Sequence, residues 1–429
     1  MFLSRLIFVV LTVQLLSGVA IFAGTPAVAE RQEPQMLRWR KQVIQIAVST
    51  SLTQPSNNIK SDSDVLTALS RSLVAWSSVA NIEFRLVTSE RQNVSPVGRL
   101  GDGISLITIA QSPENLLFFA RDPFSEAAKT RIFYNKRGYI TEADIVLNPL
   151  QQFSTDGTYG TFDLETTFAH EIGHLLGLRH SAVIGSLMSD KVARNTGQRI
   201  PDTVRAILSE SDATAIRNLY PTDTQEDCCG AITGKLLLQS GKGARLATVW
   251  AEDSETGLIV GQTETSGDGS YRIGGLKNGR YSLFWQRKEK GSGLSSGDIG
   301  KANVDENNVV LATQKMTSAR SDVVLTHIGK DMQLGDSSIE IRAGGEYMIV
   351  IGGKNLKVNS VNLEFNSPFL QVYPDSLRSE DFGEEVEVIS FILKIDREAP
   401  AGVYSIFARD REGRRTVLVG AITVQNTLR

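Results

Sequence analysis

The feature that most constrains this chain is the short segment 170–180, which reads His-Glu-Ile-Gly-His-Leu-Leu-Gly-Leu-Arg-His. The 429 residues include only 4 histidines, and three of them lie in this segment. On a helix, His170 and His174 are four residues apart and project from one face. A separate apolar stripe, expected to pack against a sheet, consists of Leu164, Phe168, Ile172 and Leu175. The segment therefore predicts a helix with one apolar side and one side that holds two imidazoles.

The same segment predicts a catalytic zinc site. Gly177 stands where a residue of left-handed conformation can end the helix without a Cβ clash, so the chain can reverse and return His180 as a third ligand. Three neutral imidazoles leave the fourth tetrahedral position of one Zn²⁺ to water, and the metal lowers the pKa of that water to about 7. Glu171 is expected to act as the general base that takes the proton and passes it to the leaving amine. The remote His327 is expected to be an ordinary surface or turn residue.

The pattern HExxHxxGxxH resembles the metzincin clan of zinc proteases, and a methionine supports the resemblance. Met188, within residues 186–189, follows the third histidine at the place where metzincins have a methionine turn beneath the metal. We expect its polarisable side chain to form an apolar floor under the imidazoles. The alternative for Met188 is a generic buried methionine.

Within the clan the chain is similar to the matrixins. The segments that carry this similarity are residues 68–84, 142–149 and 162–188, with residues 208–221 similar to the closing helix of the family. The resemblance implies an α+β zincin-like (metzincin) catalytic domain over residues 30–222. It also implies a shallow cleft in which an extended peptide adds as a strand to the edge of the sheet, expected at Arg131–Tyr134.

The chain departs from the family pattern in its additional metal sites and in the residues that follow Met188. Animal matrixins bind a second, structural zinc through further histidines, which this chain lacks, so we expect one catalytic zinc. A structural Ca²⁺ is an open alternative, with candidate oxygen ligands at Asp102, Asp144 and Asp156 in expected loops. Met188 is followed by Ser and Asp rather than by the usual aromatic residue and proline, which leaves the wall of the main specificity pocket undetermined.

Composition and patterning beyond residue 222 predict two all-β sandwich domains. Residues 223–229 are acidic and are expected to form a linker. Residues 230–328 contain short period-2 runs separated by turn signals, and they resemble the carboxypeptidase-regulatory type of β-sandwich; the Gly/Ser-rich stretch 290–307 is expected to be a loop. Residues 329–429 repeat this style and resemble immunoglobulin-like modules. These modules are expected to bind a surface or the substrate, or to act as spacers.

The amino terminus predicts export. Arg5 precedes an apolar run from Leu6 to Phe22, and Ala27-Val28-Ala29 fits a cleavage site, so residues 1–29 are interpreted as a signal peptide. An uncleaved membrane anchor is the alternative, because the run approaches spanning length. After cleavage the protein is expected to be secreted or extracytoplasmic and to have no stable membrane span.

The cysteine content excludes a disulfide framework. The only cysteines, Cys228 and Cys229, are adjacent and cannot connect distant segments. A ring between these neighbours, an intermolecular bridge and two free thiols remain as alternatives.

The charge balance argues against a nucleic-acid partner. Lys and Arg total 45 against 48 Asp and Glu, so the formal net charge is -3, whereas a nucleic-acid-binding domain is expected to be clearly basic. The sequence therefore predicts a secreted zinc-dependent endopeptidase that hydrolyses extended polypeptides. An inactive protease-like adhesion or binding protein is the alternative, although a binding protein has no need of the proton carrier Glu171.

Overall fold

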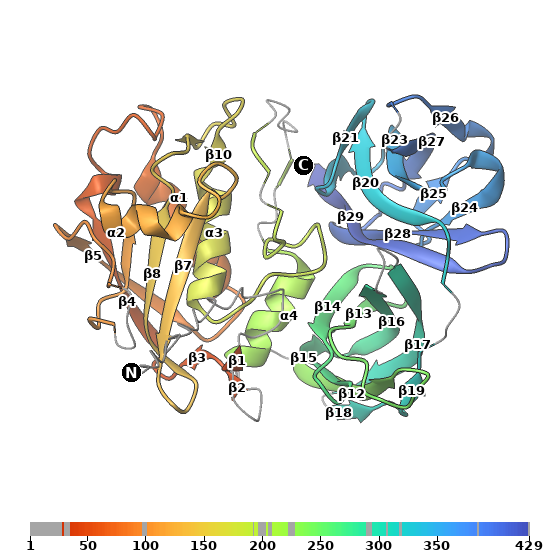
Figure 1. The fold of residues 1–429 in the computed structure, drawn as a ribbon, viewed down its shortest axis with the longest axis horizontal. Coiled ribbons are helices and arrows are strands. Elements are labelled where there is room, and N and C mark those ends of the chain that lie inside the picture. The colour runs from red at the N-terminus through yellow and green to blue at the C-terminus, as the bar shows by residue number, and fades with distance from the viewer. Residues whose placement is uncertain are drawn as a thin grey trace, which may run out of the picture.

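A computed structural model describes most of the chain (Figure 1). The described residues are 28–29, 35–96, 101–191, 193–195, 203–204, 208–221, 228–288, 294–305, 308–316, 320–383 and 386–427. Most of the expected signal peptide and most of the expected linker lie outside these residues. Val28–Ala29 form strand β1, which pairs with β2 (Gln35–Met36). Among the described residues, no helix combines the length and the apolar character that crossing a membrane requires.

Residues 35–221, the N-terminal part, are built on a six-stranded sheet. Its strands are β3 (Arg38–Trp39), β4 (Val43–Ser49), β5 (Glu83–Ser89), β6 (Leu106–Thr108), β7 (Ala128–Tyr134) and β8 (Tyr139–Leu147). The order is β3-β8-β6-β4-β5 with parallel pairing, and β7 pairs antiparallel with β8. The strand expected at residues 131–134 lies within β7. Among the described strands, β7 pairs only with β8.

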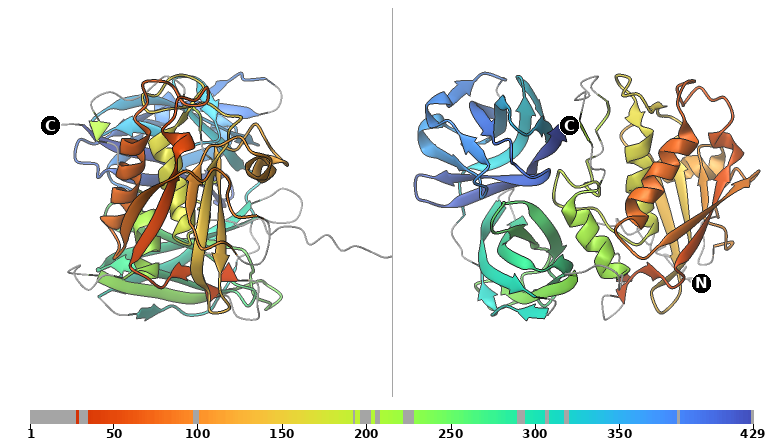
Figure 2. Two further views of the ribbon diagram at one scale, coloured as in Figure 1. Left: turned by 90° about the vertical axis from the view of Figure 1, so that its left-hand side faces the viewer. Right: turned by 180° about the vertical axis from the view of Figure 1, so that it is seen from behind.

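Two long helices pack against each other and against this sheet (Figure 2). α1 (Val65–Ser77) begins after Asp64, whose side chain accepts the N–H of Thr67, as the sequence predicts for an N-cap. α3 (Leu164–Leu175) contains the predicted apolar stripe, and all four of its residues are fully buried in the core. Smaller elements of this part are β9 (Phe153–Ser154), β10 (Phe162–Asp163) and α2 (Pro113–Leu116).

α4 (Glu210–Leu219) lies between the N-terminal part and the β-rich remainder (Figure 1). Ser209 and Asp212 form a capping box at its start. Buried Arg217 donates from Nε to the carbonyl of Gly275 at 3.1 Å and pairs with Glu210 at 2.6 Å. α4 therefore contacts both the N-terminal part and the β-rich remainder.

Residues 228–315, the middle β part, form two sheets around a common core. The first contains β12 (Cys228–Leu237), β15 (Ser270–Lys277), β18 (Asn308–Val310) and β19 (Gln314–Lys315). The second, in the order β14-β13-β16-β17, contains β13 (Thr248–Asp253), β14 (Ile259–Glu264), β16 (Gly279–Lys288) and β17 (Leu294–Val304).

Two expectations for the middle β part were wrong. Residues 294–304 form a strand and not a loop, because they pair along their length with β16 and bury Ile299 and Val304 despite the polar composition. Cys228 and Cys229 belong to β12 and not to a linker. Cys229 is disulfide-bonded, which excludes a free thiol at that position.

Residues 320–427, the C-terminal β part, form a second pair of sheets. One contains β20 (Val324–Lys330), β21 (Gln333–Gly335), β23 (Glu346–Lys354), β25 (Leu370–Val372), β26 (Arg378–Glu380) and β27 (Glu387–Ile395). The other contains β22 (Ile339–Arg342), β24 (Val361–Glu364), β28 (Gly402–Asp410), β29 (Arg415–Thr427) and also β11 (Thr203–Val204) from the N-terminal part. The boundary expected at residues 328–329 was wrong, because it falls inside β20, which pairs with β23. His327 lies in this strand, partly exposed.

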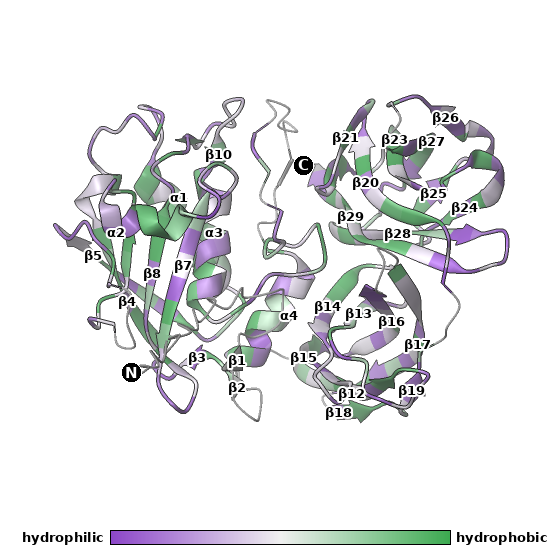
Figure 3. Ribbon diagram, in the orientation of Figure 1, coloured by the Kyte–Doolittle hydropathy of each residue, from purple (hydrophilic) through white to green (hydrophobic). Residues whose placement is uncertain are grey.

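The hydropathy pattern agrees with this arrangement (Figure 3). Apolar residues colour the strands that face the cores, whereas the hairpin tips and outer loops are hydrophilic. The two β parts nevertheless share an interface, in which Trp250, Phe284 and Phe407 pack together. The two β parts therefore pack against each other and are not connected by the chain alone.

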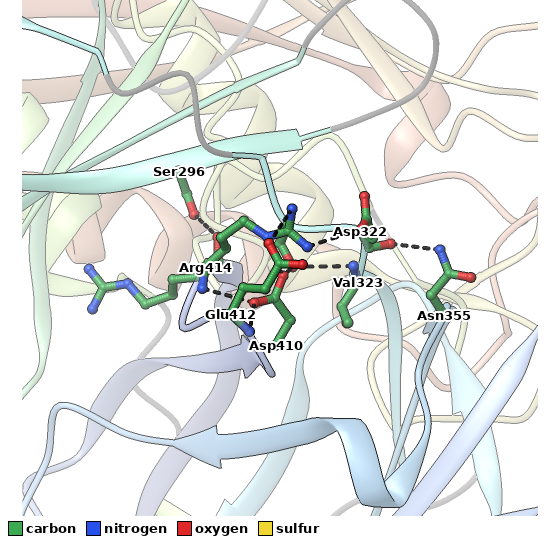
Figure 4. Close-up of polar contacts among 9 residues, drawn as sticks. Ser296, Asp322, Val323, Asn355, Asp410, Glu412 and Arg414 are labelled. Atoms are coloured by element: carbon green, nitrogen blue, oxygen red, sulfur yellow. Dashed lines mark hydrogen bonds and ion pairs between the residues drawn. The ribbon is translucent and has the colours of Figure 1, made fainter.

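Polar contacts reinforce this interface. Ser296 of β17 donates across it to the carbonyl of Arg415 at 2.7 Å, while Arg414, at the tip of the β28–β29 hairpin, pairs with Asp410 and Asp322 within the C-terminal β part (Figure 4). Deeper in, the buried carboxylate of Glu252 accepts hydrogen bonds from Trp250 Nε1 at 2.9 Å and from Asn366 Nδ2 at 2.8 Å. Burial raises the pKa of Glu252 to about 7, although these hydrogen bonds and the charge of Arg415 oppose the shift.

The raised pKa makes the stability of this interface depend on pH. A carboxyl whose pKa is higher in the folded state favours folding most below its unfolded pKa, near 4.5, and this contribution is lost as the pH rises through about 7. Glu252→Gln cannot ionise. The substitution should therefore remove a pH-dependent change in the free energy of unfolding of up to about 3 kcal/mol. Denaturant unfolding at pH 5 and pH 8 measures it. The exposed Glu255→Gln serves as control, and equal pH dependence in Glu252→Gln and wild type would contradict the assignment.

Candidate metal centre

The histidine-bearing helix has well-defined ends. Asp163 caps its start by accepting the N–H of Thr166 at 2.9 Å. At the other end, Trp39 Nε1 donates to the carbonyl of Leu175 at 2.8 Å and Tyr220 Oη donates to that of Leu176 at 2.7 Å, which satisfies carbonyls that the helix leaves unpaired. Gly177 follows with φ +100, as the sequence predicts, and a Cβ there would collide with the backbone of Leu37. The chain therefore reverses sharply toward His180.

The structure brings the three predicted histidines together. Nitrogens of His170, His174 and His180 all lie within 4.8 Å of one another, and the ring centroids are 4.7 to 5.3 Å apart. The Nε2 atoms of His170 and His174 are 3.1 Å apart. A tetrahedral zinc ion with Zn–N bonds of about 2.0–2.1 Å would hold two such nitrogens about 3.3 Å apart.

The hydrogen bonds of the rings determine which nitrogens face inward. His170 Nδ1 donates to the carbonyl of Leu187 at 2.7 Å, and His174 Nδ1 donates to that of Leu178 at 2.9 Å. Burial lowers the pKa of all three histidines, most strongly that of His174, so the rings are neutral and each carries one proton. Since Nδ1 holds that proton in His170 and His174, their Nε2 atoms face each other with lone pairs only. Such an arrangement suits a shared cation, and the donor set fits zinc.

The carboxylate of Glu171 lies beside these rings, on the same helix. The side chain is buried, and its Oε2 accepts a hydrogen bond from Thr130 Oγ1 of β7 at 2.5 Å. Burial raises the pKa of Glu171, while His170 and the Thr130 hydrogen bond oppose the shift. This environment holds the carboxyl closer to its protonated form than an exposed glutamate would be, as suits a group that accepts and releases a proton.

A second layer of contacts holds the histidine side chains in place. Buried Asp212 of α4 accepts from Leu187 N–H at 2.9 Å and from Ser186 Oγ at 2.5 Å, while the Leu187 carbonyl is the acceptor for His170. Met188 is buried, and its Sδ occupies the space that a Cβ on Gly173 would need. The methionine therefore packs against the helix between His170 and His174.

The three aspartates proposed as calcium ligands do not converge. Asp102 pairs with Arg91, and Asp156 pairs with Lys60. Asp144 is buried and accepts the N–H groups of Ser95 and Leu106 at 3.0 and 3.1 Å, and burial raises its pKa to about 6. Within the described part of the chain, the three histidines are the one cluster of His, Cys, Asp or Glu side chains close enough to share a metal.

Sequence reasoning missed two residues of this site. Asp212 belongs to a Ser-x-x-Asp pattern that signals a helix start, so its position was detectable, but its contact with the Met188 turn was not. Thr130 has no local signal, since only sheet pairing places β7 beside α3.

A helix that carries two histidines and an intervening glutamate, a third histidine beyond a glycine turn, and a methionine packed against that helix are together the features of the metzincin class of zinc metalloproteases. The family model described as Matrixin matches residues 119–221. The chain therefore contains a matrixin-like metalloprotease domain.

One curated relative agrees with this assignment. Metalloendoproteinase 1 of Glycine max is 27% identical over 190 residues, which cover 43% of this chain and 53% of that protein. The chain thus spans about half the length of this relative, and the similarity supports the family and not a particular substrate.

Among solved structures, BcpA, the major pilin subunit of Bacillus cereus, matches with 11% identity and a TM-score of 0.17, over 46% of this chain and 69% of that one. A putative adhesin from Bacteroides ovatus matches with 12% identity and a TM-score of 0.16, over 46% and 82%. Scores this low support no argument about either β part.

Asp212 provides a test of the second layer of contacts. In Asp212→Ala, the N–H of Leu187 and the hydroxyl of Ser186 lose their buried acceptor, so the turn that orients His170 should loosen and zinc affinity should fall about 10- to 100-fold. Competition with a chromophoric chelator measures this affinity. Asp64→Ala, which removes an exposed helix cap, is the matched control and should bind zinc as wild type does. An unchanged affinity in Asp212→Ala would exclude the proposed role.

Proposed function

We propose that the protein is a secreted zinc-dependent endopeptidase with a zincin-like catalytic domain, in which His170, His174 and His180 hold one catalytic zinc and Glu171 is the general base. The observation that carries the proposal is the 3.1 Å approach of the Nε2 atoms of His170 and His174, with the third histidine and a buried carboxylate beside them. A purely structural cluster would have no need for that carboxylate. Secretion rests on the signal pattern of residues 1–29.

The residues around the site have different roles in the proposed hydrolysis. Zinc, when bound, supplies a Lewis acid that permits hydrolysis at neutral pH. Glu171 takes a proton from the attacking water and delivers it to the leaving amine, and Thr130 orients the carboxylate for both transfers. Met188 excludes solvent from the helix side of the histidines.

Substrate binding is assigned to β7. This strand pairs with β8 along one edge, and it carries Thr130, the partner of Glu171, so a peptide added as a further strand would pass close to the base. The substrate class is therefore an extended polypeptide held by its backbone. Residues 30–222 are proposed as the catalytic domain, followed by two β-sandwich modules that meet between residues 316 and 324.

The alternative function is a protease-like adhesion or binding protein without activity. Two accessory β parts are compatible with it, but the retained Glu171 and its hydroxyl partner favour catalysis. The two functions differ in whether zinc-loaded protein cleaves casein or gelatin, and in whether a chelator stops the cleavage.

Glu171→Ala tests the assigned base. The variant should retain one zinc per chain, since the three imidazoles are unchanged, while cleavage of a quenched peptide library should fall by about 10²–10⁴-fold because the proton carrier is lost. Elemental analysis and initial rates measure the two quantities. Cleavage at the wild-type rate in this variant would refute the mechanism.

His180→Ala provides the complementary test of the third ligand. Removing one of three imidazoles should abolish stoichiometric zinc binding and cleavage together, because two remaining ligands hold the ion poorly. The remote His327→Ala is the control and should keep both. Retention of a full equivalent of zinc in His180→Ala would show that the ligand set is different.

A further inference from the structure

The loop between the third histidine and the methionine, residues 181–187, is not an ordinary surface loop. It leaves the N-terminal part and lies against β28 and β29 of the C-terminal β part (Figure 1). Ile184 N–H donates to the carbonyl of Val419 at 3.0 Å, and Val183 is completely buried with Val403 and Val419. The loop is therefore held by a backbone hydrogen bond and by an apolar anchor.

The loop lies so close to the sheet that glycine is required both in the loop, at Gly185, and in β29, at Gly420. A Cβ on Gly185 would lie 2.8 Å from the carbonyl oxygen of Gly420, 2.8 Å from Val403 Cγ1 and 2.9 Å from Thr423 Oγ1. Gly420 has φ +74, and a Cβ there would lie 2.5 Å from Val183 Cγ1. No side chain fits between the two surfaces without displacing one of them.

The strand that receives the loop is itself held by hydrogen bonds from the middle β part. Gln286 Nε2 donates to the carbonyl of Val417 at 2.9 Å. Ser296 Oγ, also from the middle β part, donates to that of Arg415 at 2.7 Å (Figure 4). The N-terminal part adds a second connection, because Lys191 pairs with Asp336 at 2.9 Å and β11 pairs with the end of β29. β29 therefore offers a rigid support.

Both ends of the loop belong to the metal centre. Ser181 N–H, next to His180, donates to the carbonyl of Met188 at 2.6 Å, and the carbonyl of Leu187 accepts from His170 Nδ1. A displacement of the loop would therefore shift the third ligand and the acceptor that orients the first.

We propose that the C-terminal β part is a positioning element of the metal centre, in which β29 holds Val183, Ile184 and Gly185 and thereby keeps His170 and His180 in ligating geometry. The inference deepens the proposed function and rests on it. It assigns to the C-terminal module a role in zinc binding in place of a role as a spacer.

Gly185→Val in the full-length chain tests the proposal. The added side chain should push the loop away from β29 and raise the zinc dissociation constant about 10- to 100-fold, the range typical when supports of ligands are lost. Val183→Ala, which removes the apolar anchor without adding bulk, is the second variant if Gly185→Val fails to fold. Both are measured by competition with a chromophoric chelator, and by the visible spectrum of the cobalt-substituted protein.

Two controls separate positioning from general stability. Gly267→Val adds the same side chain at a position with open space and should leave zinc affinity unchanged. Ile351→Ala removes a buried side chain from β23, in the sheet opposite β29, so it should lower the thermal unfolding temperature without changing zinc affinity in the folded protein.

A rescue experiment adds a readout that instability alone would not produce. In Gly185→Ala the Cβ meets Thr423 Oγ1 at 2.9 Å, so combining it with Thr423→Ala, which leaves the Val183 anchor intact, should recover part of the zinc affinity that Gly185→Ala loses. Wild-type zinc affinity in both Gly185→Val and Val183→Ala would overturn the inference and leave the proposed function intact, as would an equal loss in Ile351→Ala. A wild-type chain that binds no zinc would instead overturn the proposed function.

Discussion

The structure depends on an arrangement that is unfavourable without a cation, namely buried neutral imidazoles whose unprotonated nitrogens face one another. His170 and His174 donate hydrogen bonds from Nδ1 to backbone carbonyls, so their Nε2 atoms, 3.1 Å apart, turn their lone pairs toward each other. A fold keeps such an arrangement only if the surrounding groups hold it firmly. This constraint explains why the neighbourhood of α3 is so densely hydrogen-bonded.

The supports come from four distant places in the chain. Trp39 and Tyr220 bind the last carbonyls of α3, Thr130 of β7 binds Glu171, and Asp212 of α4 fixes the turn that accepts the proton of His170. β29 then holds the loop that joins His180 to Met188. The accessory β parts are thus continuous with the metal centre, whereas their architecture alone suggested attached modules.

Much of the N-terminal part could be predicted because its signals are local. Asp64 as a cap, Gly177 as a left-handed helix end and the buried stripe of α3 follow from helix geometry and from the steric limits of the Cβ atom. The strand at residues 294–304 and the true position of β20 were missed, because polar composition obscures a strand whose partner is elsewhere in the sequence.

The sequence by itself determined that His170, His174 and His180 would come together, with Glu171 beside them, since residues one helical turn apart share a face in any helix and the spacing to His180 requires a reversal at Gly177. It also determined the metalloprotease class. Only the tertiary structure decided that Asp212 orients His170, that the three calcium candidates do not converge, and that the loop 181–187 lies on β29. These contacts join residues tens to hundreds of positions apart, and no local pattern encodes which distant surfaces meet when cores of several sheets assemble.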